Sequence, residues 1–343
     1  MTQTTIKDVA VRAGVSKTTV SHVINKTRFV EEETRQKVLL AIDELQFRVN
    51  TAARSLTTKR TETLGIVISD SSNHFFGELL RSIDEVIRPQ NYSLIICNTN
   101  EILEHEAHYL NLLLNQRVDG IIAAATSQPW IELAKAKVQH TPIVFVDRAY
   151  DNFDGFYVGV DNQAGAYMGT QHLIQCGYRK IGILAGLERL STMRQRLNGY
   201  CQALQESDIE VNHEWIIPSQ LSIDGGQQAM RALCSLENKP DALFINNNIL
   251  ALGALLEMTE LNLECVNDLG IVAFDDHPWA AVSNPPLTVV RQPTQKIGQY
   301  SAEMIMALIN NQPVPEKQVI LSCELVERQS CQPLHAKKSS HSV

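Results

Sequence analysis

A chain of 343 residues that is 44% apolar and 20% charged is too apolar to be disordered and long enough for a small domain and a large one. It has no apolar run that could cross a bilayer and no export signal at its start. Its seven cysteines are scattered without metal-ligand or disulfide spacing. We therefore expect a cytoplasmic protein that has no membrane contact, no metal and no other cofactor.

The net charge of −8 is unevenly distributed along the chain. Residues 1–60 contain 11 Lys and Arg against 6 Asp and Glu, a net charge of +5, which leaves −13 for the other 283 residues. A basic head on an acidic body is typical of proteins that bind DNA through the head alone. Charge alone leaves open that the surface is merely uneven.

The first sixty residues predict three short helices. Ile6, Val9, Ala10 and Ala13 form one apolar stripe behind the helix-capping residue Thr5. A second helix is expected over 17–25, after a turn at Gly14-Val15 and a cap at Ser16. A third begins within 30–34 and turns Val38, Ala41, Ile42 and Leu45 toward the core.

The second helix has the arrangement of a DNA-recognition helix. Lys17, Thr18, Ser21 and His22 stay on its outer face, near the end that presents side chains to the major groove. An ordinary three-helix bundle would show the same periodicity, so the periodicity does not settle the function. The candidate DNA-binding residues here are Thr5, Ser16, Lys17, Thr18, Thr19, Ser21, His22 and Asn25.

The residues themselves point to a family. Ile-Lys-Asp-Val-Ala, Ala-Gly-Val-Ser and Thr-Val-Ser-His-Val-Ile-Asn resemble the headpiece of the lactose/galactose (LacI/GalR) repressor family. The stretch 16–30 is especially similar to the purine and ribose repressors of that family. The resemblance implies a bacterial, nucleoid-associated regulator that binds double-stranded operator DNA.

The resemblance extends to a hinge over 49–61 that orders on the operator and kinks it from the minor groove. It adds four DNA-binding residues: Asn50, Ala53, Arg54 and Leu56. Leu56 matches the leucine that wedges into a base step, although simple linker packing is the alternative for an exposed leucine. Val49 departs from the proline that the family often has there.

The remaining chain predicts two α/β subdomains. Short apolar strands, such as 64–69, 120–124 and 180–185, alternate with amphipathic helices, a pattern typical of parallel, doubly wound sheets. The series restarts near Asp161. Two such sheets in tandem form a cleft at their C-terminal strand ends, where open α/β folds bind ligands. The resemblance implies a periplasmic-binding-protein-like type I body.

No catalytic motif is present, since GxxxxGK[ST], GxGxxG after a strand and GxSxG are all missing. We therefore predict a regulator without enzymatic activity. A sugar-processing enzyme would need a set of catalytic residues that we do not find. An exported sugar-binding protein would lack the first sixty residues.

The family pattern assigns candidate effector residues at strand ends and in the R-x-R-x-x-G pattern of 194–199. They are Phe75, Phe76, Asp147, Arg148, Asp161, Thr192, Arg194, Arg196, Asn248 and Asp275. Arg196 is expected to hold the ligand as a bidentate clamp and Asp275 to accept its hydroxyl groups. The alternatives are a structural ion pair for these two, core packing for Phe75 and helix capping for Asp147.

These residues lead us to expect repression of carbohydrate-catabolism genes. Arg148, Arg189, Arg194 and Arg196, together with Asn248 where the family usually has aspartate, favour a sugar acid or sugar phosphate over a neutral sugar. A purine-responsive repressor is the alternative that the head suggests. Against it, Leu221-Ser222 stands where the purine repressor has a phenylalanine and an acid.

A single helix-turn-helix reads only half a site, so we expect a homodimer on a pseudo-palindromic operator. The tail lacks leucine heptads, which argues against a coiled-coil tetramer. The predicted divisions are a headpiece at 1–48, a hinge helix and linker at 49–61, an effector and dimerisation domain at 62–335 and a flexible tail at 336–343. Within the body, the N-subdomain takes about 62–161 plus 291–322, and the C-subdomain about 162–290 plus 323–335.

Overall fold

The computed structural model describes residues 4–25, 28–47, 60–126, 131, 134, 141–148 and 153–332. The chain divides into two compact units, Met1–Thr61 and Glu62–Val343. Each unit has its own core and is described by itself. None of the described helices is both long enough and apolar enough to cross a membrane.

The first unit is a three-helix bundle, as predicted. It contains α1 (Ile6–Ala13), α2 (Lys17–Asn25) and α3 (Glu32–Glu44). The Asp8 carboxylate accepts hydrogen bonds from the Thr5 backbone N–H and hydroxyl at 2.8 and 2.7 Å, which fixes the start of α1. Gly14 has φ +68°, a left-handed conformation that lets the chain turn into α2.

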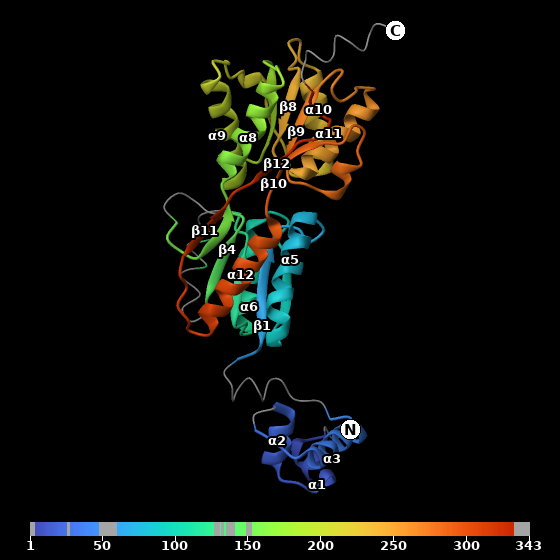
Figure 1. Ribbon diagram of the computed structural model, residues 1–343, viewed down its shortest axis with the longest axis vertical. Coiled ribbons are helices and arrows are strands. Elements are labelled where there is room, and N and C mark those ends of the chain that lie inside the picture. The colour runs from blue at the N-terminus through green and yellow to red at the C-terminus, as the bar shows by residue number, and fades with distance from the viewer. Residues whose placement is uncertain are drawn as a thin grey trace. The chain divides into compact units, whose positions relative to one another are not determined.

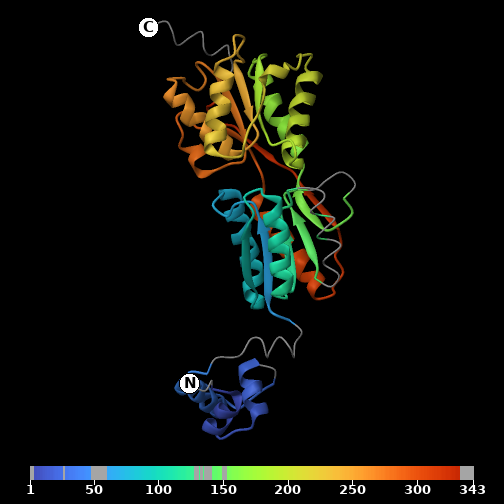
Figure 2. The same cartoon turned by 180° about the vertical axis from the view of Figure 1, so that it is seen from behind.

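The second unit begins with a six-stranded, wholly parallel sheet in the order β11-β5-β4-β3-β1-β2 (Figures 1 and 2). Helices α5 (His74–Ile87) and α12 (Thr294–Ile309) pack on one face, and α6 (Leu103–Asn115) packs on the other. The 3-10 helix η1 (Arg88–Gln90) follows α5. The strands are β1 (Thr63–Ile68), β2 (Ser93–Asn98), β3 (Gly120–Ala123), β4 (Ile143–Val146), β5 (Tyr157–Val160) and β11 (Gln318–Leu321).

A second six-stranded sheet follows, in the order β12-β10-β9-β8-β6-β7, with only the β10–β12 pair antiparallel. Helices α8 (Asn162–Gln175) and α9 (Ser191–Glu206) cover one face, and α10 (Ile223–Cys234) and α11 (Asn248–Glu260) cover the other. The 3-10 helix η2 (His213–Trp215) lies between α9 and β7, and η3 (Pro278–Ala281) lies between β9 and β10. The strands are β6 (Ile181–Gly186), β7 (Ile216–Pro218), β8 (Ala242–Ile245), β9 (Gly270–Phe274), β10 (Thr288–Arg291) and β12 (Glu324–Val326).

The chain crosses between the two sheets three times, after β5, β10 and β11. The predicted parallel sheets are confirmed, with the predicted strand and helix ends within three residues of the observed ones, the largest difference being at the start of α9. The sequence patterns did not predict α10, α12, β5, β7, β10, β11 or β12. For β11 and β12 the reason is physical, because both strands are only partly buried and carry little apolar periodicity.

Candidate DNA-recognition helix and effector cleft

Helix α2 buries one side and leaves the other exposed. Val20 and Val23 are buried in the core of the three-helix bundle. Lys17 and Thr18 are exposed, and Ser21 and His22 are half-buried beside them. The Ser16 hydroxyl accepts a hydrogen bond from the Thr19 backbone N–H at 3.0 Å, which caps the helix at the end where those side chains gather. The packing thus leaves a polar surface on a rigid helix.

The remaining predicted DNA contacts are placed unequally. Thr5 and Asn25 are exposed at helix ends, and Thr19 is half-buried. Asn25 donates from its amide to the Ser21 hydroxyl at 3.1 Å. The hinge residues Asn50, Ala53, Arg54 and Leu56 lie outside the described residues.

A cavity of about 380 Å³ lies between the two sheets of the body, where loops leave the carboxyl ends of their strands. This is the position at which open α/β sheets bind ligands. Its walls mix apolar side chains with amides, hydroxyls and charges: Ser69, Asp70, Ser72, Asn73, Phe75, Phe76, Asn100, Glu101, Asp147, Arg148, Thr192, Met193, Arg196, Leu221, Ser222, Ile223, Asn247, Ile249, Asp275 and Gln292.

Two acids occupy equivalent positions in the two subdomains. Asp147 follows β4 with φ +65°, and Asp275 follows β9 with φ +75°. Each donates its backbone N–H to the next strand, Asp147 to Val158 at 3.1 Å and Asp275 to Val290 at 2.8 Å. A left-handed conformation is uncommon at a non-glycine residue, and the surrounding structure must hold it in place. The fold therefore turns one carboxylate from each subdomain toward the cavity.

Arg196 is fixed before any ligand arrives. Its Nε donates to the Asn162 side chain at 2.8 Å, and its Nη1 donates to the Asn246 carbonyl at 2.5 Å. The guanidinium also lies 3.6 Å from the centre of the Phe274 ring and 4.0 Å from the Asp275 carboxylate. Burial lowers the pKa of Arg196. This side chain is a preformed donor at the floor of the cavity.

Arg148 is neutralised by its neighbours. It donates two hydrogen bonds to the Glu101 carboxylate, at 2.9 and 2.7 Å, and its Nε lies 3.3 Å from the Asp147 carboxylate. Burial raises the pKa of Asp147. Arg189 donates to the backbone carbonyl of Glu101 at 3.0 Å. Two of the arginines expected to attract an anion are therefore engaged with the protein itself.

The two subdomains also touch directly at the rim of the cleft. The side-chain amides of Asn73, after β1, and Asn248, at the start of α11, exchange hydrogen bonds at 3.2 and 3.5 Å. Asn73 also accepts from the Phe75 backbone N–H at 3.1 Å and so caps α5. An amide at position 248 can both donate and accept here, whereas a carboxylate could only accept.

Comparison with known proteins decides the family. The model described as "Bacterial regulatory proteins, lacI family" matches residues 5–50, and the "Periplasmic binding protein-like domain" matches residues 170–331. The HTH-type transcriptional repressor PurR of Photobacterium profundum is 34% identical over 333 residues, covering 96% of this chain and 99% of that protein. PurR of Vibrio vulnificus is 35% identical over 326 residues, covering 94% and 97%.

The chain belongs to the LacI family.

Solved structures support the same assignment. The lac repressor dimer bound to operator and the anti-inducer ONPF is 26% identical, covers 96% of this chain and all of that chain, and has a TM-score of 0.86. A complex of the regulator CelR with cellobiose is also 26% identical, with the same coverage and a TM-score of 0.72. This LacI-family chain is a DNA-binding transcriptional repressor with a periplasmic-binding-protein-like type I body, and it is not an enzyme.

Seven of the ten effector residues predicted for this LacI-family chain line the cavity, and three do not. The Asp161 carboxylate instead accepts from the Ala164 backbone N–H at 2.8 Å and caps α8. Arg194 is half-buried on α9 and is not among the lining residues, and Asn248 is engaged at the rim. The seven are Phe75, Phe76, Asp147, Arg148, Thr192, Arg196 and Asp275.

Sequence reasoning missed most of the polar lining of this LacI-family cleft. Asp70, Asn100, Glu101, Asn247 and Gln292 all come within four residues after a strand ends. The rule that ligands meet the carboxyl ends of parallel strands would have found most of them. It would not have found Gln292, because β10 itself was not predicted.

Proposed function

We propose that this LacI-family repressor responds to a small neutral ligand of the purine class that binds in the cleft. The full-length match to the PurR repressors carries the proposal, since four of them are 34–35% identical over at least 94% of this chain. This favours the purine alternative over the carbohydrate ligand that the sequence suggested first.

The charge of the cavity supports a neutral ligand. Four carboxylates line it, Asp70, Glu101, Asp147 and Asp275, against the two guanidiniums of Arg148 and Arg196. This is a formal excess of two negative charges. One excess negative charge remains to repel an anion even when Asp147, whose pKa is raised by burial, is protonated. A sugar acid or sugar phosphate would have to overcome that field, whereas the N–H groups of a purine base can donate to it.

The wall chemistry suits a flat ring. Phe75, Met193, Leu221 and Ile223 supply apolar surface, and Phe75 meets Phe76 edge to face with ring centres 5.1 Å apart. In place of the aromatic partner expected for a purine, Leu221 would contact one face of the ligand. Arg196 and Asp275, 4.0 Å apart, offer the ligand a hydrogen-bond donor and an acceptor in the same cavity.

A neutral sugar is the second candidate. The CelR neighbour was solved with cellobiose, and strand-end carboxylates such as Asp147 and Asp275 are good acceptors for sugar hydroxyls. Both candidates agree with the charge of the cavity, so a binding experiment must separate them.

Calorimetry on the reduced, full-length chain separates the candidates, using hypoxanthine, guanine, cellobiose, ribose, gluconate and glucose 6-phosphate. We expect heat with a purine and none with gluconate or the phosphate. Asp275→Asn should weaken that binding about 10- to 100-fold, as expected when one charged hydrogen-bond acceptor is lost. The matched control is Asp268→Asn, an exposed acid on a loop of the same subdomain. Binding of a sugar alone would favour the second candidate, and binding of an anion alone would contradict both.

We further propose that Lys17, Thr18 and His22 contact the major groove and that Leu56 enters the minor groove. Support comes from the exposed position of Lys17 and Thr18 on a capped, rigid helix. In this proposal the headpiece and hinge are residues 1–61, and the body that follows binds the effector. Selection of bound fragments from random duplex DNA should return a pseudo-palindrome, and a site without two-fold symmetry would contradict a dimeric reader.

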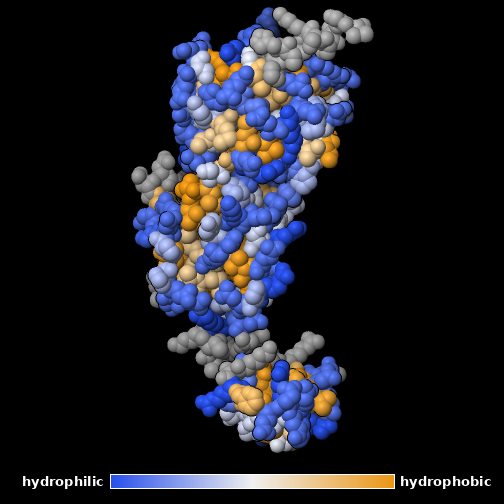
Figure 3. Space-filling model, in the orientation of Figure 1, coloured by the Kyte–Doolittle hydropathy of each residue, from blue (hydrophilic) through white to orange (hydrophobic). Residues whose placement is uncertain are grey.

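The dimer is proposed to form through the body. The face drawn in Figure 3 carries several apolar patches among hydrophilic residues. Exposed apolar side chains of the body include Val282, which is 81% exposed, together with Ile223 and Leu256. Sedimentation velocity on the full chain should give a dimer with and without DNA.

A further inference from the structure

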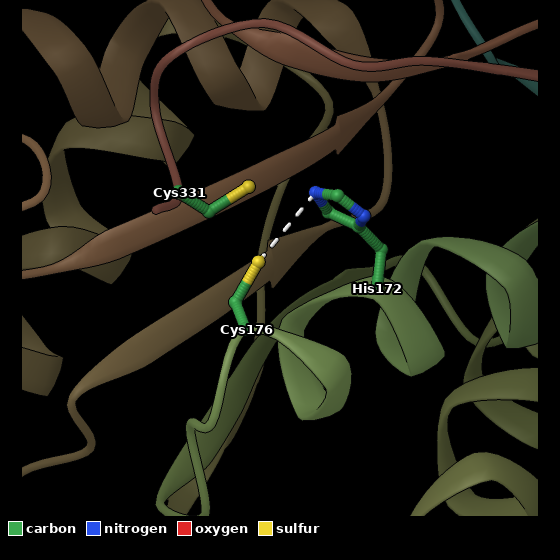
Figure 4. Close-up of side chains that lie close together, drawn as sticks. All are labelled: His172, Cys176 and Cys331. Carbon is green, nitrogen blue, oxygen red and sulfur yellow. Dashed lines mark hydrogen bonds between the residues drawn. The ribbon is translucent and has the colours of Figure 1, made fainter. Parts of the chain in front are cut away.

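A histidine and two cysteines converge at one end of the second sheet, outside the cleft. His172 projects from the last turn of α8, Cys176 is the residue directly after that helix, and Cys331 approaches from the C-terminal segment (Figure 4). The imidazole Nε2 of His172 lies 3.8 Å from the Cys176 Sγ, and the three potential ligand atoms all lie within 4.8 Å of one another. The cysteines are reduced and buried, and His172 is half-buried at the rim.

Two independent constraints hold these side chains together. His172 and Cys176 are four residues apart, so the helix places them on one face, one turn apart. Cys331 follows Ser330, whose hydroxyl accepts from the Thr288 backbone N–H at 2.8 Å and donates to the Ile271 carbonyl at 2.7 Å. Helix α8 therefore positions His172 and Cys176, and the hydrogen bonds of Ser330 to the second sheet position Cys331. The three side chains do not come from one flexible loop.

The spacing matches the coordination of a thiophilic metal ion. Two thiolates and one imidazole around Zn²⁺, with bonds of about 2.0–2.3 Å, place ligand atoms about 3.5–3.8 Å apart in a tetrahedron. The observed 3.8 Å between nitrogen and sulfur fits, and the longest separation needs a movement of only about 1 Å. We propose that His172, Cys176 and Cys331 form a binding site for a thiophilic metal ion, with Zn²⁺ as the ion of choice.

The fourth position of such a site has a candidate ligand. Glu327 is exposed, follows β12 directly and lies four residues before Cys331 on the same C-terminal segment. Either this carboxylate or a water molecule completes a tetrahedron. A bound ion would tie α8 to the C-terminal segment and so stabilise the second subdomain.

The metal site is separate from the effector cleft. Asp161 caps the start of α8 at the end of the sheet where the cleft opens, and the 14 residues of the helix span about 20 Å. Metal binding is therefore expected to raise the melting temperature of the body without competing with the effector. This expectation holds whichever effector the cleft takes.

The test is a zinc titration of the metal-free, reduced full-length chain against a chromophoric chelator. We expect one Zn²⁺ per chain, and an affinity at least about 100-fold lower in Cys176→Ser, Cys331→Ser and His172→Gln, because loss of a direct ligand exceeds the usual cost of losing a supporting contact. Cys234→Ser, which changes a partly buried cysteine on α10, is the matched control and should bind like the wild type. Glu327→Gln should lower the affinity less than the three ligand variants.

Cobalt gives a readout that misfolding does not imitate. With saturating Co²⁺ the wild type should show a thiolate-to-metal charge-transfer band, and each cysteine variant, which keeps one of the two thiolates, should show about half its intensity while melting normally without metal. Wild-type chain that takes up no metal, or variants that bind as tightly as the wild type, would overturn the proposal. So would mild oxidation that joins Cys176 to Cys331 in a chain indifferent to zinc, since the pair would then be a redox site.

Discussion

The headpiece and the body place charged residues in opposite environments. In the headpiece, Arg12 and Glu44 pair at 2.6 Å with side chains 57% and 49% exposed. In the body, Arg148 and Glu101 pair at 2.7 Å with side chains 4% and 15% exposed. Loss of an exposed ion pair lowers the free energy of unfolding only slightly, whereas loss of one partner of a buried ion pair lowers it strongly. The exposed charges of the headpiece therefore remain available to bind DNA. The buried charges of the body are needed to stabilise the structure around the cleft.

The largest effect is expected from breaking the buried pair. Glu101→Gln removes the carboxylate that accepts two hydrogen bonds from Arg148 and leaves Asp147, 3.3 Å from its Nε, as the nearby counter-charge, which should destabilise the body by up to about 3–5 kcal/mol. Glu44→Gln in the headpiece should cost under about 1 kcal/mol. All three tryptophans lie in the body, so denaturant unfolding followed by tryptophan fluorescence reports the first variant and helix circular dichroism the second. Similar losses in both would contradict the comparison.

A second buried acid, Glu106, should make the stability of the body depend on pH. Glu106 is fully buried on α6, where its Oε1 accepts from the Thr126 backbone N–H at 2.9 Å. Burial raises the pKa of Glu106 from 4.5 to about 7. Between these two values the folded chain holds a proton that the unfolded chain has lost. The contribution of Glu106 to stability is therefore fully present below pH 4.5 and is lost as pH rises toward 7.

Glu106→Gln should remove that dependence and keep the acceptor. Relative to the variant, the wild type should lose up to about 3 kcal/mol of unfolding free energy between pH 4.5 and 7, as one pKa unit corresponds to about 1.4 kcal/mol. Subtracting the variant also cancels the titration of the histidines. Parallel curves for the two proteins would show that the pKa of Glu106 is the same in the folded and the unfolded chain, and would contradict the prediction.

The two regions also differ in how far the sequence predicts them. The proposed DNA-reading face lies on one helix, so the spacing of Val20, Val23 and the residues between them was enough to place Lys17 and Thr18 on the exposed side. The cleft gathers residues from strands far apart in the chain, and no local pattern reports which of them meet. Asp161 illustrates the limit, because a strand-end acid can cap a helix or bind a ligand and looks the same in sequence.

The arginines show the same limit for charge. Four of them near the cleft suggested an anionic ligand, but Glu101, which neutralises Arg148, lies 47 residues away in sequence. Only the fold brings these partners together. By contrast, the family resemblance was carried by contiguous headpiece motifs and needed no tertiary information.

A smaller effect is expected when base contacts are removed from α2. Each lost contact to a base edge costs about 1–3 kcal/mol of discrimination, so Thr18→Ala and His22→Ala should each flatten the preference for the operator over altered sites. Gln36→Ala, on the exposed side of α3, is the control. Fluorescence anisotropy with operator variants measures the preference. Equal losses on operator and random DNA would assign both residues to phosphate contacts.

The smallest expected effect separates the two roles open to Lys17. As a phosphate contact, Lys17→Ala should weaken binding to all sequences alike and reduce the slope of log affinity against log salt by about 0.9. Lys37→Ala is the matched control, because Lys37 is a basic residue of the same headpiece whose ammonium is held by Glu33 at 2.7 Å. Anisotropy from 50 to 200 mM salt gives both slopes. If Lys17→Ala has the same salt slope as the wild type but a changed base preference, Lys17 contacts a base and not a phosphate. Other basic residues of the headpiece would then make the phosphate contacts.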